Sequence, residues 1–154
     1  MEEKRTKLQK YIDFKLGRGE ELEQLKVMVK KSFQAASFRQ FWQYWNPVYS
    51  YFLAKYIYKP VKGMLPDSLA VLLTFTASGF LLHDLPIMIF VFSITGKLLS
   101  FPVTIYFLLL GLTVIIGEQF SLRFDNINSK KRILIHTGVL IGLFLVSMLI
   151  QFRI

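Results

Sequence analysis

The chain has 154 residues, a formal net charge of +9, no cysteine and 53% hydrophobic residues, including 15 phenylalanines. A soluble domain of this length does not need so many apolar residues, so the composition indicates a membrane protein. The lack of cysteine excludes disulfides, thiolate metal ligands and a cysteine nucleophile, and we expect neither a metal site nor a bound cofactor.

The positive charge is concentrated near the N-terminus. Residues 1–62 carry 13 Lys/Arg against 6 Asp/Glu. A basic, aromatic-rich segment beside membrane spans favours contact with anionic lipid headgroups over contact with nucleic acid. No apolar core of a signal peptide appears in this segment, so we expect a mature, cytoplasmic N-terminus.

Residues 1–36 are predicted to form a cytoplasmic, basic, amphipathic helical region. Apolar residues recur there at helical spacing, with acidic residues in the first turn, where the helix dipole favours them. The repeating residues are Leu22, Leu25, Val29, Phe33 and Ala36.

Residues 37–62 are predicted to form an aromatic helix with a break. The stripe consists of Phe38, Trp42, Trp45, Tyr49, Phe52 and Tyr56. Nearby lysines favour a helix lying in the membrane interface, and packing against the other helices explains the stripe equally well. Pro47 disfavours a helical conformation for Asn46, which is therefore either a helix cap or a functional residue.

Residues 63–154 are predicted to form the transmembrane region of an all-α, multi-pass integral membrane protein. Its three apolar spans are expected at about 69–94, 101–117 and 133–151. Lys/Arg number 13 before the first span and then 1, 4 and 1, which indicates a cytoplasmic N-terminus. Gly138 and Gly142 form a GxxxG pattern, which is typical of close helix packing.

The first span contains a polar interruption at His83, Asp84 and Pro86. Proline lacks the backbone N–H that a helix requires, so we expect the helix to break near Pro86. An ionisable residue at membrane depth is by default a candidate functional residue, and His83 is the stronger candidate of the two. The alternative is a neutral imidazole of His83 that forms a hydrogen bond between helices, with Asp84 pointing towards a loop. We interpret His136 as lying at the membrane interface. For Glu118 we favour a boundary residue at the water over a polar group that faces the same cavity as His83.

Three segments in this order resemble one family. The segment "SFRQFWQYWNPVYSYFLAKYIYKPVK" resembles the FW-x-x-WN … Y-x-P signature of membrane-bound O-acyltransferases. The segment "FTASGFLLHDL" is similar to the Ser-Gly-x-x-x-His motif of its wax-synthase-like branch, and "FLLLGLTVIIGEQF" resembles the next span. The resemblance covers about residues 37–120 and corresponds to the C-terminal signature region of the family.

The resemblance implies transfer of an acyl group from acyl-coenzyme A to a hydroxyl acceptor. It places the family's histidine at His83, as the general base, and its asparagine at Asn46. Trp42 and Trp45 are then expected to line an acyl tunnel, and Asp84 is a further candidate for substrate binding. Pro47 after Asn46 and Asp84 after His83 depart from the family pattern.

The short chain leaves other functions open. Family members have more spans before this region, so we expect that the chain oligomerises, pairs with a partner membrane subunit, or is an inactive C-terminal fragment. A non-enzymatic membrane subunit and an oligomeric pore former are the alternatives to an enzyme.

Overall fold

The computed structural model describes residues 5–97 and 102–153, which form helices joined by short turns and contain no strand. Most elements are α-helices, and two, η1 and η2, are single π-helical turns. In chain order the elements are α1 (Lys7–Leu16), α2 (Glu21–Phe33), α3 (Phe38–Tyr44), α4 (Pro47–Leu53), η1 (Ala54–Tyr58), α5 (Lys59–Lys62), α6 (Asp67–Gly79), η2 (Phe80–Asp84), α7 (Leu85–Thr95), α8 (Val103–Gln119) and α9 (Ser129–Gln151).

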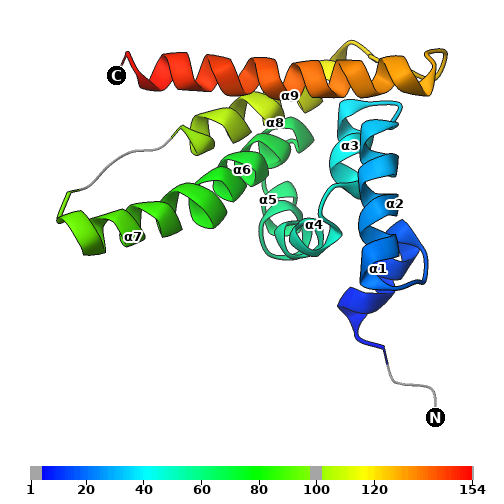
Figure 1. The fold of residues 1–154 in the computed structure, drawn as a ribbon, viewed down its shortest axis with the longest axis horizontal. Helices are drawn as coiled ribbons and strands as arrows, with labels where there is room; N and C mark the ends of the chain where they lie inside the picture. The colour runs from blue at the N-terminus through cyan, green and yellow to red at the C-terminus, as the bar shows by residue number, and fades with distance from the viewer. Residues whose placement is uncertain (1–4, 98–101, 154) are drawn as a thin grey trace.

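The helices form two groups, which Figure 1 shows side by side. In the first group α6, η2 and α7 follow one line, α8 packs along α6, and α9 lies across α8. In the second group α2 and α3 pack against each other, and α1 contacts both α3 and α4. The groups meet where α3 packs on α8 and α2 packs on α9, and these contacts position the cavity described below.

The helix that contains Pro86 does not break, so this prediction was wrong. Instead α6 continues into α7 through the π-turn η2, where the N–H of Leu85 bonds to the carbonyl of Phe80. A π-turn adds one residue to the turn, and such turns occur where a regular helical ladder is disrupted. The helix therefore accommodates Pro86 through a wider, π-helical turn just before it.

Two glycines allow the close packing of α6 on α8. A Cβ atom on Gly79 would lie 2.9 Å from the Cα of Thr104, and one on Gly111 would lie 3.0 Å from the Cβ of Phe75. The distance at Gly79 is too short for a side chain, so glycine is required there, and the distance at Gly111 is tighter than most Cβ contacts, which favours glycine. By contrast, a Cβ atom on Gly138 or Gly142 would meet no described atom within 4 Å.

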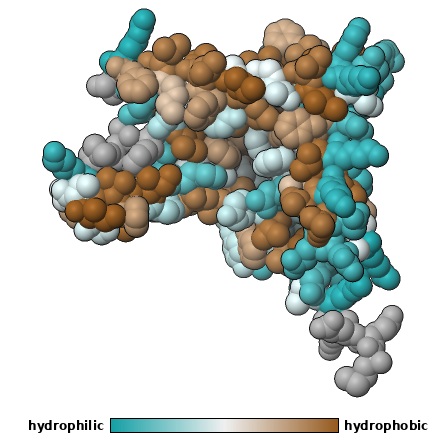
Figure 2. Space-filling view, in the orientation of Figure 1, coloured by the Kyte–Doolittle hydropathy of each residue, from teal (hydrophilic) through white to brown (hydrophobic). Residues whose placement is uncertain are grey.

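Two helices are long and apolar enough to cross a membrane. These are the continuous helix Asp67–Thr95, with 29 residues, and α9, with 23 residues. In the most apolar 18-residue stretch of each helix, only 17% and 11% of the residues, respectively, are buried in the protein. The core helices of a soluble domain are mostly buried, so these two helices differ from them. Figure 2 shows hydrophobic side chains over α7 and α9 and hydrophilic ones along α1 and α2.

The predicted middle span is represented by α8, a shorter apolar helix of 17 residues. The predicted start of that span, Phe101, lies outside the described residues.

An aromatic cluster joins the two groups of helices around His136. This side chain is 2% exposed, so the surrounding helices enclose it, and its depth at the membrane interface stays a prediction. Its ring lies 5.1 Å from the ring of Phe41 and 5.5 Å from that of Phe38, and its Nε2 lies 3.1 Å from the carbonyl oxygen of Ala35. The small Ala35 and Ala36, both buried, allow α9 to approach this closely.

Candidate functional site

A cavity of about 390 Å³ lies between the two helix groups. Its walls come from α1, α3, α4, η1, α6, η2 and α8, and most of the lining residues are aromatic or aliphatic. Apolar cavities with a few polar groups are typical of small-molecule binding sites. The predicted site residues that line it are Trp42, Trp45, Asn46 and His83.

His83 reaches the cavity from the π-turn η2. Its Nδ1 lies 3.1 Å from the carbonyl oxygen of Ser78, and its ring lies 4.8 Å from the ring of Phe107 at a tilt of 34°. Because a carbonyl oxygen only accepts hydrogen bonds, this contact requires the proton on Nδ1. The neutral imidazole then has its lone pair on Nε2, which is the arrangement that a base needs.

Asn46 caps α4 and also lines the cavity. Its φ of 43° is in the left-handed region, which asparagine tolerates better than most residues, and its Oδ1 accepts a hydrogen bond from the N–H of Tyr49 at 3.2 Å. Capping uses only the side-chain oxygen. The two N–H bonds of Nδ2 therefore remain for a ligand, and the two interpretations of Asn46 are compatible.

The two tryptophans pack differently against the protein. Trp42 contacts Phe75 edge-on, with ring centroids 5.2 Å apart, whereas Trp45 stacks on Phe41 at 5.7 Å. Edge-on and offset stacked pairs are favourable aromatic arrangements that restrict both rings. The tryptophans thus give the cavity a rigid, apolar wall from α3 and its C-terminal end.

Asp84 does not line the cavity, unlike the other four predicted residues. It is 3% exposed, and its Oδ2 accepts hydrogen bonds from the backbone N–H, at 2.7 Å, and the hydroxyl of Thr104. Oδ2 therefore bonds to the first turn of α8, whereas the buried Oδ1 has no hydrogen-bond partner among the described residues. A role of Asp84 in substrate binding stays a prediction.

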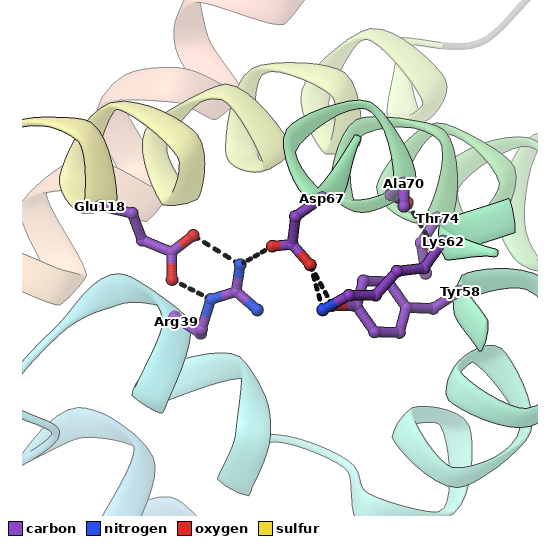
Figure 3. Close-up of polar contacts among 7 residues, drawn as sticks. All are labelled: Arg39, Tyr58, Lys62, Asp67, Ala70, Thr74 and Glu118. Carbon is purple, nitrogen blue, oxygen red and sulfur yellow. Dashed lines mark hydrogen bonds and ion pairs between the residues drawn. The ribbon is translucent and has the colours of Figure 1, made fainter. Parts of the chain in front are cut away.

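A charged cluster around Arg39 lies at the opposite ends of α6 and α8 from Asp84 (Figure 3). Arg39, on α3, pairs with Asp67 at 2.9 Å and with Glu118, and Asp67 also bonds to Tyr58 and Lys62. Burial alone lowers the pKa of Arg39, but its hydrogen bonds to Glu118, Tyr58 and Asp67 raise it above the ordinary value. The cluster therefore keeps its charge and ties α3 to α6 and α8.

Arg39 also separates the cavity from a second, more polar one of about 440 Å³. Arg39, Gln43 and Val114 line both cavities. The sequence did not reveal this cluster, because Arg39 is 28 residues from Asp67 and 79 from Glu118. Glu118, interpreted as a boundary residue, is half exposed but ion-paired.

Other features of the site are partly visible in the sequence. Ser78, which accepts the His83 hydrogen bond, belongs to the quoted Ser-Gly motif, whereas Phe107 has no local signal. Within residues 5–97 and 102–153, no three His, Asp or Glu side chains gather as metal ligands do.

Comparison with protein families gives one match. Residues 22–115 match the model of the MBOAT, membrane-bound O-acyltransferase family. The matched range covers more than half of the chain and includes Trp42, Trp45, Asn46 and His83. No curated protein and no solved structure matches the chain.

Proposed function

Because the chain belongs to the membrane-bound O-acyltransferase family, we propose that it transfers an acyl group from acyl-coenzyme A to a hydroxyl acceptor, with His83 as the general base. The observation that carries the proposal is that His83, Asn46 and the two tryptophans line the same cavity. This cavity lies beside helices that are long and apolar enough to cross a membrane. The Ser78-Gly79 motif before His83 is the basis for proposing the wax-synthase-like branch.

In the proposed reaction, Nε2 of His83 takes the proton of the acceptor hydroxyl as its oxygen attacks the thioester carbonyl. The tetrahedral intermediate then collapses, the C–S bond breaks, and the coenzyme A thiolate takes the proton from the imidazolium. The ester forms without a covalent acyl-enzyme. Nδ2 of Asn46 would donate a hydrogen bond to the negatively charged oxygen of the intermediate.

The remaining parts of the donor suit other parts of the cavity. Trp42 and Trp45 provide apolar surface for the acyl chain, which favours binding of a long aliphatic group. Lys15, on α1, lines the same cavity and would attract the phosphates of coenzyme A. Membrane lipids are the proposed surroundings, and no resident cofactor is required.

The first test is release of free thiol from a panel of acyl-coenzyme A donors, with lipid and sugar alcohols as acceptors. The purified wild type should release thiol only when an acceptor is present. His83→Ala should lower the rate by about 10²- to 10⁴-fold, as expected for loss of a general base. Leu82→Ala alters the exposed neighbour on the same π-turn and should retain the activity.

Equal helicity of the variants by circular dichroism ensures that folding does not explain a loss. Acceptor-dependent release that persists in His83→Ala would remove this residue from the mechanism. No release from any donor by the wild type would reject enzymatic activity of the isolated chain.

The second candidate is a non-enzymatic membrane subunit, and one observation favours it. The face of α9 around Gly138 and Gly142 meets no neighbour among the described residues and is open to a partner subunit or a second copy. Gly142→Leu should abolish association if this candidate is correct, while His83→Ala should not. For an oligomeric pore, the remaining alternative, ion leakage from liposomes is the corresponding test.

A further inference from the structure

Asp84 makes an interaction that the proposed reaction does not use. It is the last residue of the π-turn η2, and its carboxylate faces the first turn of α8 across the helix interface. Both of its hydrogen bonds come from one residue, Thr104, through the backbone N–H and the hydroxyl. Among the described residues no Lys or Arg pairs with Asp84, so α8 supplies its stabilising partner.

The carboxylate performs the role of a helix cap from a different helix. The first N–H groups of an α-helix have no partner within the helix, and a negative charge near them is favourable. Pro102, at the N-cap position of α8, provides no side-chain hydrogen bond. Asp84 thus satisfies a donor at the start of α8 that the local sequence leaves unpaired.

Close packing surrounds this interaction. The Cα of Gly79, immediately before η2, approaches the backbone of Thr104 and the Cβ of Phe107 so closely that no side chain fits. Phe107, one turn further along α8, contacts the ring of His83. The π-turn is therefore held on α8 at both of its ends, by Gly79 before it and by Asp84 at its last residue.

We propose that Asp84 is a positioning residue, whose carboxylate binds the first turn of α8 and thereby fixes the orientation and tautomer of His83. With η2 fixed on α8, Nδ1 of His83 stays within reach of the Ser78 carbonyl and Nε2 remains the basic nitrogen. The catalytic meaning of this arrangement rests on the proposed function. The tautomer itself does not, and it can be measured without any substrate.

The test uses the fact that the chain has only two histidines, His83 and His136. In protein labelled with ¹⁵N-histidine and reconstituted in nanodiscs, NMR distinguishes a proton on Nδ1 from one on Nε2 for each ring. We expect wild-type His83 to be predominantly in the Nδ1–H form. His136 lies in the separate aromatic cluster and serves as an internal control of folding.

Asp84→Ala and Thr104→Val should each shift the signals of His83 towards a mixture of tautomers, with the signals of His136 unchanged. Thr104→Ser keeps both donors and should preserve the wild-type spectrum. Unchanged His83 signals in Asp84→Ala would overturn the proposal. If Asp84→Ala shifts the signals of His136 as well, that variant is misfolded. Thr104→Val, which replaces only the hydroxyl by a methyl group, then decides: unchanged His83 signals in this variant would overturn the proposal.

Kinetics separate this proposal from the proposed function. If thiol release is observed, Thr104→Val should lower kcat by about 10- to 100-fold, as expected for a misplaced catalytic group, and leave the KM for the donor within about twofold. A raised KM with unchanged kcat would contradict the role of Asp84. Absence of wild-type activity would contradict the proposed function alone, since the NMR result stands without it.

Discussion

Arg39 is a side chain that connects three helices, α3, α6 and α8, at one point. Its guanidinium bonds to carboxylates on α6 and α8 from a position on α3, and its side chain is only 30% exposed. Partial burial reduces screening by salt, and a planar guanidinium can bond two carboxylates at once. The pairs of Arg39 should therefore stabilise the fold more than exposed ion pairs do.

Arg39→Ala should lower the free energy of unfolding by about 1–3 kcal/mol, because it leaves Asp67 and Glu118 without their partner. The matched control is Arg123→Ala, since Arg123 pairs with Asp125 at the exposed surface and should contribute nothing measurable. Unfolding in increasing concentrations of denaturing detergent, followed by circular dichroism, gives both values. Equal stability of the two variants would contradict the structural role of Arg39.

At the scale of elements, the pairing of α6 with α8 determines where the site forms. The GxxxG pattern of α9 is visible in the sequence, yet the glycines that actually allow close packing are Gly79 and Gly111. A GxxxG pattern identifies a helix face on which a second helix can pack closely. Whether a second helix does pack there depends on the rest of the fold, which cannot be predicted from the local sequence.

Gly79→Ala should destabilise the protein by about 1–3 kcal/mol, because the new methyl group meets the backbone of Thr104. Gly138→Ala faces open space in a helix interior and should stabilise it by up to about 1 kcal/mol, since alanine is the better helix former. The detergent-unfolding midpoint measures both changes. A loss of stability in Gly138→Ala would instead show that a partner packs on this face of α9.

The sequence predicted the candidate site best where its residues lie close together in the chain. Asn46 as a cap follows from the proline after it, and the motif order is sufficient to single out the four residues that line the cavity. The contacts of Asp84 and His136 could not be predicted, because their partners, Thr104 and Ala35, lie 20 and 101 residues away. A π-turn also cannot be distinguished by periodicity from a proline break.

At the scale of the molecule, the number of membrane crossings depends on α8. With 17 residues it extends about 26 Å, slightly less than the roughly 30 Å of a hydrocarbon core. If α8 crosses the membrane, the segments on either side of it, around Lys97 and Lys130, face opposite compartments. If it does not, both lie on the same side.

We expect three crossings with a cytoplasmic N-terminus, from the distribution of Lys and Arg. Because the native chain has no cysteine, single substitutions are specific probes: Lys10→Cys and Lys130→Cys should react with a membrane-impermeant maleimide only from the cytoplasmic side, and Lys97→Cys only from the other. Reaction of Lys97→Cys and Lys130→Cys from the same side would show that α8 does not cross.

The placement of the tryptophans has a practical consequence. The chain contains two, and both line the cavity of His83, so its intrinsic indole fluorescence comes entirely from that wall. An acyl chain that enters the cavity changes the polarity around these rings, and a brominated chain quenches them. The protein therefore contains its own optical reporter of cavity occupancy, and lipid binding can be followed without attaching any dye.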